Sequence, residues 1–231
     1  MIPVQQREAP FAPHRHLPYV LPFGLFLAIL AISPHLTVLG EWEYPLRVFV
    51  LSAVVFVVSR RVLDFRIHSP FLSIGVGIAV FALWIAPEVL WPDYRSHWLF
   101  SNSITGTPSS SLDSVHRDSL MVLVFRTIRA AVLVPIIEEL FWRAWLMRWL
   151  IRPDINSVPL GAWTMTSMLI SVVLFASEHG PYWEVGLLAG LFYNLLMVRT
   201  KSLGDCILAH GVTNGILSAY VIATGQWHYW G

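Results

Sequence analysis

The sequence predicts an all-α fold, a polytopic transmembrane helix bundle. Of its 231 residues, 56% are hydrophobic and only 13% are charged, whereas soluble domains carry about 25% charged residues. Seven apolar segments follow one another, and most reach the roughly 17–25 residues needed to span a bilayer. They do not alternate with a period of two, so helices are expected and barrel strands are not. The segments are residues 17–39, 44–63, 70–90, 119–137, 160–178, 183–198 and 202–224.

The chain is expected to form one integrated domain behind a short arm. Residues 1–16 are polar and proline-containing, and no small-residue cleavage site follows them, so we interpret them as a flexible N-terminal arm and not a signal peptide. Residues 17–118 are expected to hold the N-terminal membrane helices and an external loop at 91–118, which is rich in Ser, Asn, Asp and Gly. Residues 119–225 are expected to form the core.

Basic residues predict the orientation. With the N-terminus in the cytoplasm, ten of the fifteen basic residues lie on the cytoplasmic side, as the positive-inside rule requires, and seven spans then put the C-terminus outside. The ten are Arg7, Arg15, Arg60, Arg61, Arg66, Arg143, Arg148, Arg152, Arg199 and Lys201. The other side holds Arg47, Arg95 and Arg117. Arg126 and Arg129, near the outer part of the fourth helix, are interpreted as structural partners or outer-surface charges, with substrate contact as the less favoured alternative.

Four glycines predict close helix contacts. Gly75 and Gly77 lie on the third helix, and Gly186 and Gly190 form a GxxxG pair on the sixth. Small residues of this kind let membrane helices approach closely. The motif is common in membrane helices and indicates no particular chemistry.

The fourth helix is expected to continue beyond its apolar segment, from about 119 to 151, until Pro153 ends it. Such a helix exceeds the bilayer thickness. Its cytoplasmic end is therefore expected to lie on the membrane surface, with three tryptophans at the interface. These are Trp142, Trp145 and Trp149.

Two adjacent carboxylates, Glu138 and Glu139, interrupt the apolar run of this helix. A charged side chain at mid-bilayer costs at least about 2.5–3.5 kcal/mol on insertion scales, and two neighbouring carboxylates repel each other. Arg143 lies four residues after Glu139, on the same helix face. We therefore expect Arg143 to hold Glu139, while Glu138, rotated by about 100°, is free to act. The structural alternative is an ion-pair network that pins helices together.

Three more polar residues lie in the last three segments. His179 closes the fifth segment, and His210 and Asn214 share one face of the seventh. Ionisable residues in membrane helices usually face the bundle interior or a wet cavity, so these groups are expected to converge on one polar pocket with Glu138. Their structural alternatives are an interfacial histidine, an interhelical hydrogen bond and an asparagine that bridges helices.

A pocket of this composition suits hydrolysis by a carboxylate-activated water. Amide cleavage needs a base for the water, an acid for the leaving amine and donors for the oxyanion. We expect Glu138, helped by His179, to serve as the base, and His210 and Asn214 to be the donors.

Other chemistries are less favoured. Cys206 lies one turn before His210, which makes a thiol–histidine nucleophile conceivable, but a lone membrane cysteine is more often a small apolar filler. Glu138, Glu139, His179 and His210 could ligate zinc, although no HExxH pair is present. No metal and no cofactor is therefore expected. The net charge of +1 argues against a nucleic-acid partner.

Three short motifs in order resemble the type II CAAX prenyl protease family, also called the CAAX protease and bacteriocin-processing family. The EExxxR motif is Glu138 to Arg143, FxxxH is Phe175 to His179, and Hxxx(N/D) is His210 to Asn214. The resemblance covers about residues 120–220. The first half of the chain, including Glu41 to Arg47, is similar to a CAAX-protease-related bacterial subgroup associated with exosortase protein-sorting systems.

This resemblance implies a glutamate-type intramembrane endopeptidase that works without a catalytic metal. Glu138 with His179 would activate water, His210 and Asn214 would form the oxyanion hole, and two residues, Glu139 and Arg143, would support the site. The implied partners are membrane lipid and a membrane-associated or lipidated protein cut near its C-terminus, in the bacterial inner membrane. Because some bacterial members are linked to bacteriocin immunity, a non-catalytic membrane binding or immunity protein is the rival interpretation.

Two expectations from the resemblance fit imperfectly. The family core is usually described with eight membrane helices, so seven to eight are expected here. The predicted orientation also places His179 near the outer end of the fifth segment and Glu138 closer to the cytoplasm. The two meet only if the fifth helix is tilted or continues past Gly180.

Overall fold

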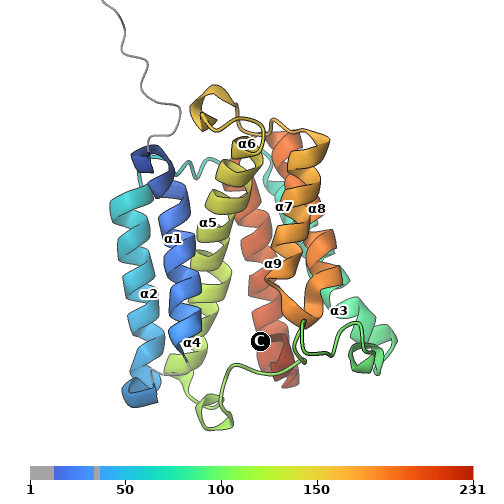
Figure 1. The fold of residues 1–231 in the computed structure, drawn as a ribbon. Coiled ribbons are helices and arrows are strands. Elements are labelled where there is room, and N and C mark those ends of the chain that lie inside the picture. Colours follow the sequence, from blue (N-terminus) through green and yellow to red (C-terminus); the bar gives the residue numbers. More distant parts are fainter. Residues whose placement is uncertain (1–12, 34–36, 231) are drawn as a thin grey trace, which may run out of the picture.

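The computed structural model describes residues 13–33 and 37–230 as an all-helical protein, and no strand occurs among them. Figure 1 shows the helices running side by side in one bundle. Their bounds are α1 Pro13–Ile32, α2 Glu43–Val54, α3 Pro70–Leu90, α4 Leu120–Ile128, α5 Val134–Glu139, α6 Met147–Trp149, α7 Met165–Ser177, α8 Trp183–Thr200 and α9 Leu203–Thr224. The predicted fold class is confirmed.

Helices cover all seven apolar segments that the sequence predicts. Five helical stretches in the described part are long and apolar enough to cross a membrane: Arg15–Ile32, Val38–Ser59, Pro70–Leu90, Leu120–Trp149 and Leu203–Thr224. The chain is thus an integral membrane protein. The total of seven to eight spans stays a prediction, because α7 is shorter than these five and α8 is not among them.

Connections alternate between the two ends of the bundle (Figure 1). The segments 60–69 and 150–164 lie at the end where α1 begins, and the loop 91–118 lies at the opposite end, near the last residues of the chain. The helix α1 begins at one end of the bundle and α9 ends at the other (Figure 1). Most of the predicted arm 1–16 lies outside the described residues.

The fourth helix is continuous from Leu120 to Trp149, as predicted. Two stretches of it, Arg129–Leu133 and Leu140–Leu146, are π-helical, a distortion frequent at functional sites. The predicted interfacial position is wrong for Trp142, which is buried within the bundle, where Phe23 of α1 packs edge-on against its ring at 5.3 Å. For Trp145 and Trp149, which are half-buried, it stays a prediction.

The helices α7 and α8 form a hairpin with a short first arm. Thr164 and Ser167 form a capping box that starts α7, and the helix ends at Ser177 after 13 residues, or about 20 Å. This is less than the roughly 30 Å hydrocarbon core. The chain turns at Gly180, with φ +53°, and His179, in this turn, lines the same cavity as Glu138.

Glycines allow neighbouring helices of the bundle to pack closely, most tightly between α3 and α9. Gly77 of α3 faces α9 so tightly that a Cβ there would lie 2.5 Å from the Ala209 carbonyl oxygen. Gly186 and Gly190 likewise place α8 against α7, as predicted, whereas Gly75 has nothing within 4 Å of its Cβ position. Three of the four glycines thus mark helix contacts, and Gly75 does not.

The start of α9 anchors the segment between α2 and α3. Asp205 is fully buried, and its Oδ1 accepts hydrogen bonds from the backbone N–H groups of His68 and Ser69, both at 3.0 Å, and from the Ser73 hydroxyl at 3.2 Å. Gly204 permits this approach, because a Cβ there would lie 2.4 Å from the Arg66 carbonyl oxygen.

We expect Gly77→Ala to destabilise the protein by about 1–3 kcal/mol, the usual cost of overpacking, because the new methyl overlaps the α9 backbone. Gly75→Ala on the same helix is the matched control and should be neutral or slightly stabilising. Thermal unfolding in detergent measures both. Equal melting temperatures for the two variants would contradict the α3–α9 contact.

Candidate active site

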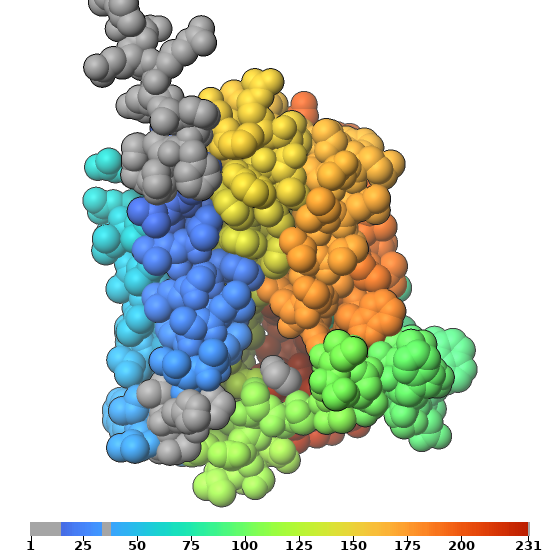
Figure 2. Space-filling model, in the orientation of Figure 1, coloured from blue at the N-terminus to red at the C-terminus, as the bar shows by residue number. Residues whose placement is uncertain are grey.

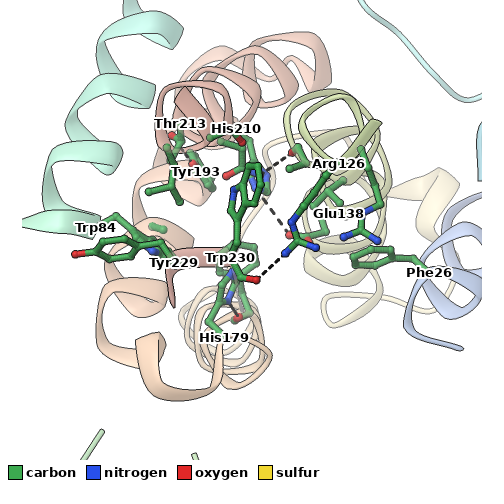
Figure 3. Close-up of a pocket in the computed structure, with 18 of the residues that line it drawn as sticks. Phe26, Trp84, Arg126, Glu138, His179, Tyr193, His210, Thr213, Tyr229 and Trp230 are labelled. Atoms are coloured by element: carbon green, nitrogen blue, oxygen red, sulfur yellow. Dashed lines mark hydrogen bonds and ion pairs between the residues drawn. The ribbon is translucent and has the colours of Figure 1, made fainter. Parts of the chain in front are cut away.

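A cavity of about 210 Å³ lies between the helices. Side chains from α1, α3, α4, α5, α7, α8 and α9 line it, together with residues after α9. Figure 3 shows polar side chains from several helices facing this space, with Phe26 on one side and Trp84 on the other. Four predicted site residues are among the lining residues: Glu138, His179, His210 and Asn214.

Glu139 lies beside the cavity and connects two helices. One oxygen, Oε1, accepts a hydrogen bond from Arg143 Nη1 at 3.0 Å and contacts His210 Nδ1 at 2.8 Å. Glu139 and Arg143 are fully buried, and their i,i+4 pair is the one the sequence predicts. The contact with His210 was not predicted. Since the carboxylate accepts, His210 carries a proton on Nδ1 and turns Nε2 toward Glu138.

Glu138 is the less constrained of the two carboxylates. It lines the cavity, is 5% exposed, and its Oε2 has no hydrogen-bond partner among the described residues. The same oxygen lies 4.0 Å from His210 Nε2. That separation is too long for a direct hydrogen bond and suits a bridging water.

His179 lies in the turn after α7. Its Nδ1 is 2.7 Å from the Phe175 carbonyl oxygen. A carbonyl only accepts, so Nδ1 carries the proton and Nε2 of the neutral ring holds the lone pair. Phe175 and Trp84 pack against the ring at centroid distances of 4.7 Å and 5.2 Å, which fixes its orientation.

A residue of α8, Tyr193, packs against the His210 ring and fixes its orientation. Tyr193 stacks on it at 4.9 Å with an interplanar angle of 22°. The Tyr193 hydroxyl donates to Thr213 Oγ1 at 2.8 Å, and Thr213 donates to the Gly77 carbonyl at 2.9 Å. An aromatic residue and a threonine in a membrane helix are so common that the sequence carries no signal for this support.

Arg143 is held on its far side by Asn194 of α8, whose Oδ1 accepts from Arg143 Nε at 3.1 Å. Asn194 in turn donates from Nδ2 to Ser171 of α7 at 2.8 Å. The polar amide of Asn194 within an apolar helix is the same kind of signal that marks Asn214, and it was available in the sequence.

Asn214 lines the cavity, and its Nδ2 donates to the Ala130 carbonyl at 2.9 Å. Ala130 belongs to the first π-helical stretch of the fourth helix. An asparagine amide carries two donor hydrogens. One is engaged with the backbone, and the second remains for a group in the cavity.

Cys206 is fully buried, its Sγ lies 3.7 Å from the Tyr193 carbonyl oxygen, and it is absent from the cavity lining. No group of three or more His, Cys, Asp or Glu side chains in the described part is arranged to hold a metal ion.

Comparison with known proteins gives one match. No curated protein and no solved structure matches the chain. A family model does match, over residues 120–216, a range that contains all three motifs, the helices α4 to α8 and the first part of α9. The first half of the chain lies outside this match, so similarity to the exosortase-associated subgroup stays a prediction. Residues 120–216 form a domain of the Rce1-like type II CAAX prenyl endopeptidase family.

Proposed function

We propose that the chain is a metal-independent intramembrane endopeptidase that uses a glutamate-activated water to cleave a membrane-associated or lipidated protein near its C-terminus. The family to which residues 120–216 belong is a protease family. One observation carries the proposal for this chain. Glu138, His179, His210 and Asn214 come from three separate parts of the sequence and line one cavity inside the membrane bundle.

The proposed base is Glu138, assisted by His179. The unpartnered Glu138 oxygen takes a proton from water while the water oxygen attacks the amide carbon. The free Nε2 of His179 accepts a hydrogen bond that orients the same water. When the C–N bond breaks, Glu138 returns its proton to the leaving amine. The products are a carboxylic acid and an amine, and one water is consumed.

The proposed oxyanion donors are His210 and Asn214. The Nδ1–H of His210 donates a hydrogen bond to Glu139, so donation from Nε2 to the oxyanion as well requires a proton on both ring nitrogens. The second amide hydrogen of Asn214 is the other donor. Donors fixed in a water-poor site need little reorganisation when charge develops.

A hollow in one face of the molecule suits a substrate that comes from the membrane. Figure 2 shows it between α1 and the loop 91–118, with dark red atoms of the C-terminal part of the chain at its floor. Phe26 and Leu30 of α1 line the cavity and are apolar. Because α1 and α3 contribute to the cavity, we propose that residues 17–118 and the catalytic core 119–225 work as one domain.

We propose a bacterial inner-membrane location with the N-terminus in the cytoplasm. The segments 60–69 and 150–164, which hold Arg60, Arg61 and Arg152, lie at the same end of the bundle (Figure 1). Under the positive-inside rule this is the cytoplasmic end.

We expect Glu138→Gln to lower turnover of a quenched lipidated peptide by about 100-fold or more, because the base is lost and the side-chain volume is kept. The assay uses protein reconstituted in liposomes. Cys206→Ala is the control, since this buried thiol does not line the cavity, and it should retain wild-type turnover. Unchanged cleavage by Glu138→Gln would disprove the assignment. Binding of the peptide without any cleavage by the wild type would favour a non-catalytic membrane protein.

We expect Glu139→Gln to destabilise the fold much more than Glu138→Gln does. The substitution leaves the Arg143 guanidinium buried without its counter-charge, and breaking a buried pair costs about 3–5 kcal/mol. The neighbouring Glu138 has no ion pair within normal hydrogen-bond distance, so its variant should unfold near the wild-type temperature. Denaturation in detergent compares the two. Equal stability would show that the Glu139 pair contributes little.

Chelation tests the metal-independent mechanism. We expect prolonged EDTA treatment to leave peptide turnover within about two-fold of the untreated protein, because Glu138 and His179 act on water directly. Loss of turnover on chelation, with recovery after zinc is added, would require a metal mechanism instead.

A further inference from the structure

A second pocket lies beside the cavity that holds Glu138. It has a volume of about 300 Å³ and shares three lining residues with the Glu138 cavity, namely Trp84, His179 and Tyr229. In Figure 3 Trp84 and Tyr229 lie at the side of the Glu138 cavity opposite Phe26. We call this second space the side pocket. Because His179 lines both spaces, a substrate residue beside the attacked bond is positioned to place its side chain in the side pocket.

The side pocket lies where the turn after α7 meets the loop 91–118. Thr107 and Ser109 of the loop line it, together with residues 180–182 of the turn. Figure 2 shows green atoms of the loop against orange atoms of the α7–α8 hairpin, at the edge of the hollow. The hydroxyl groups of Thr107 and Ser109 are able to accept hydrogen bonds, so this wall suits a ligand that donates them.

One of the residues that line the side pocket is Glu178, and its carboxylate has no counter-charge. Its Oε1 accepts a hydrogen bond from Trp142 Nε1 at 3.1 Å, a neutral donor. No ion pair includes Glu178 in the described part of the chain. Arg143, the cation next to Trp142 in the sequence, is paired with Glu139 at 3.0 Å. Ionisable residues within membrane bundles usually have a charged or polar partner, and an intramembrane carboxylate without a cation indicates a functional site.

The guanidinium group of Arg95 does not compensate Glu178 either. It lies behind the side pocket, 4.3 Å from the centroid of the Tyr182 ring. Its ion pairs are with Glu184 at 2.5 Å and with Glu88 at 3.7 Å. Since two carboxylates already surround Arg95, the charge of Glu178 is left for a cation that enters the side pocket.

The Glu138 cavity itself is less suited to a cation. Arg126 and Arg129 line it and are buried, so the outer-surface position considered for them from the sequence is wrong. Arg126 Nη2 donates to the Ser111 hydroxyl at 2.7 Å, which is a structural contact. Two guanidinium groups stand against the single carboxylate of Glu138 in this lining. Like charges repel strongly in a region of low dielectric, so a basic side chain is directed to the side pocket, which neither arginine lines.

Aromatic rings complete a site for a basic side chain. Trp84 and Tyr182 stack at a centroid separation of 6.1 Å with an interplanar angle of 18°, and Tyr229 packs against Tyr182 at 5.6 Å. All three line the side pocket. Aromatic faces attract ammonium and guanidinium groups. The aliphatic stem of a lysine or arginine packs on apolar surface while its charged head reaches a polar group. The lining therefore matches a basic side chain better than an acidic or aliphatic one.

We propose that the side pocket binds a lysine or arginine side chain of the substrate, at a residue next to the bond that is cut, with Glu178 as its counter-charge. This inference rests on the proposed endopeptidase function and adds a chemical feature of the substrate to it. Glu178 is the specificity-determining residue, because its carboxylate distinguishes a cationic side chain from a neutral one of similar length.

Quenched lipidated peptides test the proposal, identical except for lysine or glutamine at one of the two residues that flank the cleaved bond. We expect the wild type in liposomes to favour lysine by about 10-fold in kcat/KM at one of these positions, as for a charge-assisted hydrogen bond. Glu178→Gln should bring the ratio close to one. Glu178→Lys should reverse the preference, in favour of a peptide with glutamate at that position. A folding defect lowers all rates and does not reverse a charge preference.

Asp113→Asn is the matched control. Asp113 is an exposed carboxylate of the loop 91–118 and lines neither the side pocket nor the Glu138 cavity. This variant should keep the wild-type preference. Equal rates for the lysine and glutamine peptides in the wild type at both positions, or a full lysine preference in Glu178→Gln, would overturn the proposal. So would an equal slowing of all peptides by Glu178→Gln with an unchanged ratio, because Glu178 would then act on the leaving amine that all substrates share.

A binding experiment separates the side pocket from the catalytic proposal. Affinities of the lysine and glutamine peptides are measured with Glu138→Gln, which is expected to bind without cutting. A preference for lysine here, combined with no cleavage by the wild type, would disprove the hydrolase and retain the side pocket as a binding site. Cleavage without any lysine preference would do the reverse.

Discussion

The buried carboxylate of Glu139 is the interaction on which the site depends. It receives the Arg143 guanidinium at 3.0 Å and the His210 imidazole at 2.8 Å on the same oxygen, and so joins the fourth helix to α9. Arg143 extends the connection to α8 through Asn194. A fully buried charge pair is tolerated only with good geometry and further hydrogen bonds, and the Asn194 amide supplies one of these. Because Glu139 occupies Nδ1 of His210, the other ring nitrogen is directed toward Glu138. The neighbouring carboxylates therefore have different roles. The Glu139 carboxylate holds the helices together, whereas the Glu138 carboxylate lines the cavity without an ion pair at hydrogen-bond distance.

Polar groups on separate helices meet only because the backbones come unusually close. Gly77 lets α3 lie against α9, and the Gly77 carbonyl then ends the hydrogen-bond chain from Tyr193 through Thr213. Gly190 allows Phe175 to pack against α8, which brings the turn with His179 toward the cavity. Small residues at helix interfaces are the usual means of close approach in membranes, where hydrophobic burial between helices drives little association. The proposed catalytic geometry thus depends on close helix packing at Gly77 and Gly190, two residues that take no part in the reaction themselves.

Features that depend on residues close together in the sequence could be predicted from it. Features that depend on how the helices pack in the bundle could not. Helical segments follow from hydropathy, and the Glu139–Arg143 pair follows from a spacing of four residues on one helix. The Glu139–His210 contact joins residues 71 positions apart, and no local pattern contains it. Trp142 was expected at an interface because tryptophan favours interfaces, yet Phe23 covers it. Hydropathy also cannot show that α7 ends after 13 residues, with His179 in the turn that follows. The three motifs identified the four cavity residues, although each motif alone was weak. Their catalytic roles remain proposals.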